Sequence, residues 1–223
     1  MTRVVDRQRA IELRKKGKTY GQIKKALNLS KSTLSDWLSD YPLSKQQLVL
    51  LKKETGKNKS LGIEKTIITK RRKREERLGN IYKNEKKRWL SLSSKELELA
   101  GLFLYWGEGK KNLRSSLAIN NTDPKVVKFA LHWMTRALKI PKNKIKVELH
   151  LYSDMDVAKE ISFWVNELRV PKAQFYKPHI KTSTRIAINQ KGFGHGTCGV
   201  IVNDVRLKEK VIMGIKAIAD TYS

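Results

Sequence analysis

The chain has 223 residues, and its 48 Lys and Arg against 21 Asp and Glu give a formal net charge of +27. Its 5 Trp, 7 Tyr and 5 Phe can form an apolar core, which excludes a fully disordered chain. No apolar run of about 18 residues predicts a transmembrane helix, and no leader pattern predicts secretion. The single cysteine, Cys198, excludes an internal disulfide. We expect one or two domains, a cytoplasmic, nucleoid-associated location, no membrane contact and a polyanionic partner, most simply nucleic acid.

The first 44 residues predict a domain of short helices. Three helices are expected, at residues 3–16, 20–27 and 31–38. Gly17 ends the first helix, and Thr19 with Gln22 forms a capping box at the start of the second. Asn28, which tolerates a positive φ, makes the next turn, and Ser30 caps the third helix. Three short helices joined by tight turns are typical of a module whose last helix enters the major groove of DNA.

This segment, from Arg9 to Leu38, resembles the helix-turn-helix of resolvases and transposases. It departs from that family at Lys24 and Asn28, where Ala and Gly are usual. The resemblance places five residues of the third helix at the DNA: Lys31, Ser32, Thr33, Ser35 and Asp36. The first three suit phosphate contacts, and the last two suit base contacts, with Asp36 accepting from a cytosine amine. An exposed acid without a DNA role is the alternative for Asp36.

Residues 45–92 predict a basic linker between two domains. Residues 52–88 carry 15 positive and 5 negative side chains, whereas the 135 residues from 89 onward carry 22 and 12. The centre of this block, residues 70–77, has no apolar side chain to bury. We expect a helical linker that contacts DNA phosphates through four residues, Arg71, Arg72, Lys73 and Arg74. A solvated helix without a partner is the alternative.

Residues 93–223 predict a domain that mixes helices and strands, so that the whole chain is α+β. A helix capped at Ser93 or Ser94 is apolar almost all round and should be buried on most faces. Strands are expected at 116–120, 146–152, 175–181, 185–189 and 199–203, and helices at 125–138, 157–169 and 207–219. The glycine-rich segment 192–199 is interpreted as a flexible hairpin connection. The four histidines lack metal-ligand spacing and are expected to be packing or surface residues.

The first helix of this domain resembles the signature helix of LAGLIDADG homing endonucleases. The resemblance rests on Leu99-Ala100-Gly101-Leu102 and, after four intervening residues, Gly107-Glu108-Gly109. In that family two such helices pack through small residues, and their terminal acids bind divalent metal at the scissile phosphates. The layout after the helix is also similar to the family's helices on a curved antiparallel sheet. One copy of the motif is visible, so the resemblance implies a homodimer.

The resemblance assigns roles to two groups of residues. Glu108 would bind Mg²⁺ and act in catalysis, with Lys110 and Lys111 as adjacent basic residues. The dimer interface would consist of Leu97, Ala100, Gly101 and Leu104. A degenerate motif that is kept for packing in a protein that does not cleave DNA is the alternative.

A basic sheet face is a further candidate for DNA contact. Lys142, Lys144 and Lys146 alternate into an expected strand, which would place all three on one face. Lys181 and Arg185 on nearby strands could extend this face, and a solvated outer face is the alternative. Together these patterns predict a site-directed double-stranded-DNA-binding protein, either a homing-type endonuclease that works as a dimer or a transcription regulator that does not cut. RNA binding is a distant third possibility, because no aromatic RNA-recognition motif is found.

Overall fold

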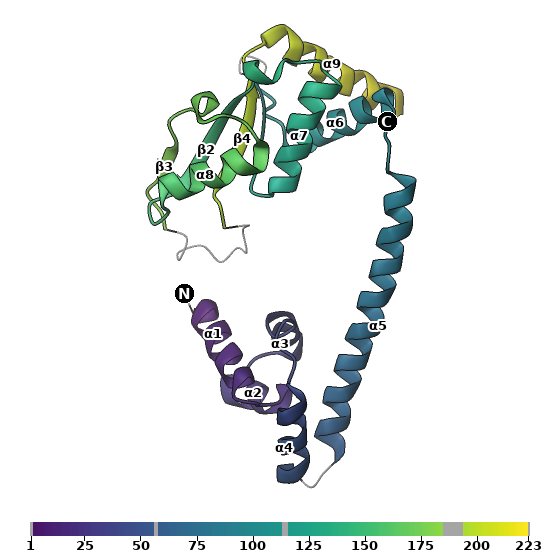
Figure 1. The fold of residues 1–223 in the computed structure, drawn as a ribbon, viewed down its shortest axis with the longest axis vertical. Helices are drawn as coiled ribbons and strands as arrows, with labels where there is room; N and C mark the ends of the chain where they lie inside the picture. Colours follow the sequence, from purple (N-terminus) through teal and green to yellow (C-terminus); the bar gives the residue numbers. More distant parts are fainter. Residues whose placement is uncertain (1, 56–57, 113–115, 185–193, 223) are drawn as a thin grey trace. The chain divides into compact units, whose positions relative to one another are not determined.

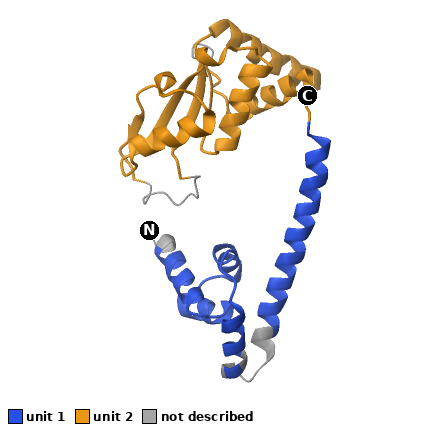
Figure 2. Cartoon of the chain, viewed as in Figure 1, with its two compact units in different colours: residues 1–90 blue, residues 91–223 orange. Residues whose placement is uncertain are grey.

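The computed structural model describes residues 2–55, 58–112, 116–184 and 194–222 (Figure 1). The chain divides into two compact units, residues 1–90 and residues 91–223 (Figure 2). None of the helices in the described ranges is both long and apolar enough to cross a bilayer.

The first unit is all-helical. Its helices are α1 (Thr2–Lys15), α2 (Tyr20–Leu27), α3 (Lys31–Trp37), α4 (Lys45–Thr55) and α5 (Asn58–Arg88). The first three surround a small core made of Ala10, Ile11, Ile23, Leu34 and Leu38. The three expected helices of residues 1–44 are therefore present with nearly the expected bounds.

The segment expected to be a separate linker belongs to the first unit up to residue 90. It forms α4 and the 31-residue helix α5, which pack against each other near their connection. The expected helical character is present, and the separation from the helix-turn-helix is not. The physical reason is a buried ion pair between Arg14 and Glu64, which ties α5 to α1.

Over its described residues, the second unit combines four α-helices with a four-stranded sheet. Its longer elements are α6 (Ser94–Glu108), β1 (Leu117–Asn121), α7 (Pro124–Arg136), β2 (Lys146–Tyr152), α8 (Val157–Leu168), β3 (His179–Lys181), β4 (Thr197–Val202) and α9 (Val205–Tyr222). The strands lie in the order β1-β4-β2-β3, and β4 is antiparallel to both neighbours. The expected antiparallel sheet is in fact mixed, because β3 runs parallel to β2 after the crossover through α8.

One segment differs from the sequence-based expectation, and another lies outside the described residues. The glycine-rich stretch was expected to be a connection up to residue 199, but β4 already begins at Thr197. Its Cys198 is buried, and burial, together with the charge of Glu148, raises the pKa of the thiol well above its usual value. The expected strand at 185–189 lies outside the described residues.

Along β2 the sheet has one covered face and one open face, whereas residues 198–202 of β4 are buried at every position. In β2 buried residues alternate with partly exposed ones, and Val147, Leu149 and Leu151 point into the core. The helices cover this side, and Trp133 of α7 and Trp164 of α8 are fully buried against it. The opposite face carries Glu148 and His150 and is half-exposed. This division follows the period of two along a strand, and it leaves a polar sheet surface.

Helix α6 is also two-sided, which corrects the expectation that most of its faces are buried. Leu97, Gly101 and Tyr105 are buried, while Leu99, Phe103 and Trp106 are 44%, 50% and 41% exposed. Burial raises the pKa of the Tyr105 hydroxyl to about 12, and this group donates to the carbonyl of Lys110 at 2.5 Å. One apolar stripe of α6 therefore belongs to the core, and the other faces outward.

Gly101 is the point at which α6 comes closest to α7. A Cβ atom at this position would lie 2.0 Å from Cδ1 of the buried Trp133 indole. Gly107 lies in the same helix, and no described atom is within 4 Å of the position that its Cβ would take. A side chain at position 101 would therefore clash with Trp133, whereas a side chain at position 107 would have space.

We predict that Gly101→Ala lowers the free energy of unfolding by about 2 kcal/mol or more, because Trp133 has no room to move aside. Gly107→Ala should instead raise it by about 0.5–1 kcal/mol, since alanine favours a helix over glycine. Urea unfolding followed by tryptophan fluorescence measures both. Equal effects of the two substitutions would show that the contact between α6 and α7 is not as close as described.

Candidate nucleic-acid interface

Helix α3 is held in the position of a recognition helix by local caps and by the core. The Ser30 side chain accepts from the backbone N–H of Thr33, and its oxygen lies 2.9 Å from Oγ of Ser32 and 2.8 Å from Oγ1 of Thr33. Leu34 anchors the inner side of the helix in the core. The hydroxyl groups expected to contact phosphates are thus gathered at the first turn of α3.

The turn before α3 has the expected conformation. Asn28 has φ 49° and ψ 44°, the left-handed conformation that asparagine tolerates, and the capping box between Thr19 and Gln22 is formed. Lys24 is exposed, so the charged side chain that replaces the usual alanine does not disturb the core. Lys31, Ser32, Ser35 and Asp36 are exposed on α3 and are available to a partner.

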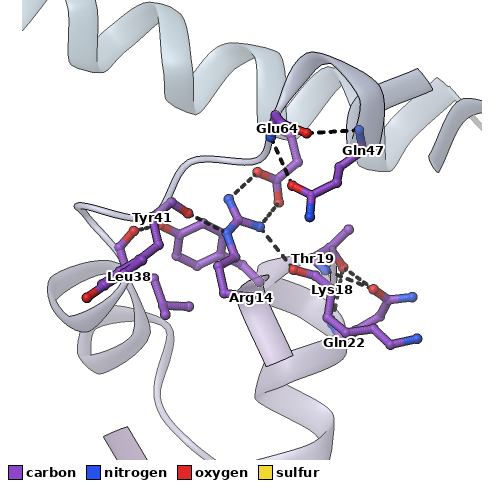
Figure 3. Close-up of polar contacts among 10 residues, drawn as sticks. Arg14, Lys18, Thr19, Gln22, Leu38, Tyr41, Gln47 and Glu64 are labelled. Atoms are coloured by element: carbon purple, nitrogen blue, oxygen red, sulfur yellow. Dashed lines mark hydrogen bonds and ion pairs between the residues drawn. The ribbon is translucent and has the colours of Figure 1, made fainter. Parts of the chain in front are cut away.

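Arg14 lies at the centre of the first unit (Figure 3). Its guanidinium group makes two bonds to the Glu64 carboxylate, at 3.2 and 2.8 Å, and both side chains are 2% exposed. It also donates to the carbonyls of Tyr41 at 2.9 Å and Lys18 at 3.1 Å, and it lies over the Tyr20 ring. Burial raises the pKa of the Tyr20 hydroxyl, although Arg14 lowers it in part. The beginning of α5 is therefore fixed against the helix-turn-helix.

The basic residues predicted on α5 do not all have the same surroundings. Arg71 lies 2.9 Å from Glu75 and 3.5 Å from Asp40, and Arg72 lies 3.5 Å from Glu76. Lys73 and Arg74 are exposed and form no ion pair with the described residues. The sequence identified these four residues as a block but did not show which of them have acidic neighbours.

In the second unit, the end of α6 continues along the sheet. Gly109 bridges Ile119 of β1, and the backbone N–H of Lys110 donates to the carbonyl of Ala118 at 3.0 Å. Glu108, the last residue of α6, is exposed, as are Lys110 and Lys111. The three residues predicted for catalysis thus lie at one edge of the sheet.

A buried lysine on α9 binds two backbone carbonyls that follow the end of α6 in the chain. The Nζ of Lys208, on α9, donates to the carbonyls of Asn112 at 2.5 Å and Ser116 at 3.2 Å, and the residue has no exposed surface. Burial lowers the pKa of this amine, and the charge of Lys110 lowers it further. This contact could not be predicted from the sequence, because Lys208 looks like one more surface charge on an amphipathic helix.

The open face of the sheet carries a polar cluster that is not among the predicted site residues, apart from Lys110. Glu148 of β2 accepts from Nδ2 of Asn120 at 2.7 Å, and the same carboxylate oxygen is 3.7 Å from Nζ of Lys110 and 3.9 Å from Nε2 of His150. Gly199 lies between Asn120 and Glu148, and a Cβ there would be 2.3 Å from Oδ1 of Asn120. The alternation of residues 146–152 is the signal that could have placed Glu148 and His150 on one face.

The cluster continues toward the edge strand β3. His150 pairs in register with His179, and their rings are 5.3 Å apart; Tyr152 pairs with Lys181, whose Nζ lies 4.8 Å from the Tyr152 ring. Lys146 begins β2 on the same face. Lys110 thus lies beside the Glu148 carboxylate, and Lys146 and Lys181 lie further along the open face on β2 and β3.

Two residues of the predicted basic face, Lys142 and Lys144, are placed differently, and a third cannot be compared. Lys142 and Lys144 do not alternate along a strand, because residues 142–144 form a turn of 3-10 helix (η1, Lys142–Lys144) before β2. Lys142 donates to the carbonyls of Leu168 at 3.2 Å and Arg169 at 2.8 Å, so its charge neutralises the end of α8. Arg185 lies outside the described residues.

The stripe predicted to form a dimer interface is used within the chain. Leu97 and Gly101 are buried, and Leu104 packs against the core of the second unit. Trp133 occupies the space beside Gly101 that a second helix was expected to fill. The outward apolar residues of α6 are instead Leu99, Phe103 and Trp106, which border a groove of about 720 Å³ shared with Ile218 and Tyr222 of α9.

In the described part of the chain, the predicted Mg²⁺ site has few acidic side chains near it that could act as metal ligands. Among the described residues no group of three or more His, Cys, Asp or Glu side chains could hold a metal ion. Glu108 supplies one exposed carboxylate, so a Mg²⁺ ion at this position would need a second acid and DNA phosphates as further ligands. When bound there, Mg²⁺ would polarise a phosphate oxygen and activate water.

Comparison with known proteins agrees with the geometry of the first unit. Residues 1–42 match the family model of the homeodomain-like domain. No curated protein and no solved structure matches the chain. The three helices, their caps and this match together show that the chain begins with a helix-turn-helix of the DNA-binding kind.

Proposed function

We propose that this chain is a site-directed double-stranded-DNA-binding protein in which α3 reads the major groove. The observation that supports this function is the exposed polar surface of α3 on a capped, homeodomain-like three-helix core. Ser32 and Thr33 have hydroxyl groups for phosphates, and Ser35 and Asp36 are one turn further along, where base edges are read. The net charge of +27 adds affinity that does not depend on sequence.

The second unit is proposed to form a homodimer through its outward apolar surface. Leu99, Phe103 and Trp106 follow one another at spacings of four and three residues, and the rings of Phe103 and Trp106 stack at 5.8 Å. Large apolar side chains that follow a helical stripe are costly to leave in water, and a second copy of the same surface would cover them. This surface replaces the small-residue stripe as the interface.

Cleavage of DNA is proposed as a second candidate activity. It is supported by the position of Glu108, which is exposed at the end of the helix that carries the outward apolar surface. A dimer through α6 would provide two such acids. A chain that binds DNA without cutting it is the alternative. The cleavage assay described below distinguishes the two.

To test sequence reading, duplexes are selected from a random library with the whole chain, and the dissociation constants for a selected and a scrambled duplex are compared by fluorescence anisotropy. Replacing Ser35 and Asp36 together by Ala should reduce the ratio of the two constants at least about tenfold, because each base contact contributes about 1–3 kcal/mol of discrimination. Glu12→Ala removes an exposed acid from α1 and should leave the ratio unchanged. A wild-type chain that prefers no duplex would contradict the proposed function.

The dimer is tested by sedimentation equilibrium. Wild-type protein should have twice the 25.7 kDa mass of the chain, and Phe103→Glu should be monomeric because it places a charge in the interface. Met213→Glu is the matched control, since Met213 is 51% exposed, against 50% for Phe103, and lies outside the groove beside α6. A wild-type chain that is monomeric with and without duplex DNA would refute the homodimer.

For cleavage, the selected duplex is incubated with Mg²⁺ or with EDTA and analysed on denaturing gels. If the chain is a nuclease, cuts require Mg²⁺, and Glu108→Gln slows them at least about 100-fold, because metal catalysis supplies several kcal/mol. Glu209→Gln, an exposed acid on α9, should cut like the wild type. Tight binding of the duplex without any cut assigns the chain to the non-cleaving alternative.

A further inference from the structure

A groove of about 840 Å³ runs between the recognition helix and α5, within the first unit. One wall is the polar side of α3, with Ser32, Ser35 and Asp36. The other wall is α5, with Lys70, Arg71 and Arg74. The residues expected to read DNA therefore face a second, basic helix across an open space.

Helix α5 cannot leave this position at low cost. The buried pair of Arg14 and Glu64 lies three residues before Ile67, the first α5 residue in the wall of the groove. Removing one partner of such a pair costs about 3–5 kcal/mol, since the other charge stays buried. DNA that reaches α3 must accordingly be accommodated with α5 in place.

The width of the major groove decides where α5 lies on the DNA. An α-helix with its side chains is about 10–12 Å across, and the major groove is about 12 Å wide, so α3 alone fills it. A neighbouring helix on the reading side of α3 then lies over the sugar-phosphate strand that borders the groove. The positive residues of α5 are suited to that strand.

The charges in the groove indicate which residues would hold the phosphates. Arg71 is paired with Asp40 and Glu75, so its charge is already compensated. Lys70 and Arg74 are exposed and form no ion pair with the described residues. Asp36, on the opposite wall, repels a phosphate and so favours the α5 side.

From these observations we infer that α3 and α5 bind one backbone strand of the duplex between them, with Lys70 and Arg74 on successive phosphates. The inference rests on the proposed function and makes α5 part of the reading module. It also narrows the prediction for the basic block of residues 71–74. Of the four predicted phosphate contacts, Arg74 is assigned to the bound strand, and Arg72 and Lys73 are assigned to another face of α5 that does not contact the strand. Arg72 and Lys73 do not line the groove, and successive residues of a helix turn about 100° away from one another.

The test compares two double variants that each remove one lysine and one arginine from the same exposed stretch of α5. Lys70→Gln with Arg74→Gln changes the groove, and Arg72→Gln with Lys73→Gln is the matched control. Binding of the selected duplex to the full chain is measured by anisotropy from 50 to 300 mM NaCl, and circular dichroism checks that both variants remain helical.

The groove pair should weaken binding at least about tenfold at physiological salt and reduce the slope of log K against log salt by about 1.8, which is 0.9 for each lost phosphate contact. The control pair should bind within about threefold of the wild type with a nearly unchanged slope. Ethylation interference should locate the two lost phosphates on one strand, next to the bases whose preference is lost when Ser35 and Asp36 are replaced.

Three results would overturn the inference. Equal losses in both pairs would show that α5 contributes general charge, a larger loss in the control would place the DNA on the other face, and tighter binding by the groove pair would show that α5 covers α3. All three leave the proposed function intact, because they require a wild-type chain that binds its selected duplex. A wild-type chain without any duplex preference would instead remove the proposed function itself.

Discussion

The buried ion pair between Arg14 and Glu64 is the constraint on which the first unit depends. It brings together residues from α1 and α5 that are 50 positions apart, and Arg14 also donates to the carbonyls of Lys18, before α2, and Tyr41, after α3. A guanidinium group suits this role, because its planar donors satisfy a carboxylate and two carbonyls at the same time. Without the pair, three small helices and a long basic helix would share little core. With it, the orientation of α5 beside α3 becomes a property of the fold.

The second unit depends on a different constraint, the close approach of α6 to α7 at Gly101. Because Trp133 takes the place of a side chain there, α6 turns one stripe to the core and the other to solvent. The same packing fixes the end of α6 at the sheet edge, where Gly109 bridges β1 and Lys110 reaches the Glu148 carboxylate. The helix tip and the polar sheet face are thus parts of one surface.

Features set by neighbouring residues could be predicted from the sequence, and features set by distant ones could not. The capping box at Thr19, the turn at Asn28 and the cap at Ser30 are local, and all are present. The partner of Arg14 could not be predicted, because Glu64 lies in a block that looks like a solvated linker. Lys142 was misplaced for a similar reason, since its role is to end α8, which is distant in sequence. The candidate DNA residues of α3 could be found because they follow a local cap.

The formal net charge overstates the number of positive side chains that are available to DNA phosphates. Within α5, Arg71, Arg72 and Arg88 each have a glutamate one turn away. Glu64 of the same helix forms its ion pair with Arg14. Exposed pairs of this kind contribute little to stability, yet each one compensates a positive charge locally. The positive side chains without an ion pair among the described residues, such as Lys70 and Arg74, are therefore the best candidates for contacts with phosphates. The few acids of the basic block neutralise particular positions, so its remaining positive charge points in a particular direction. Which positions are neutralised depends on neighbours in three dimensions rather than on the composition of the segment.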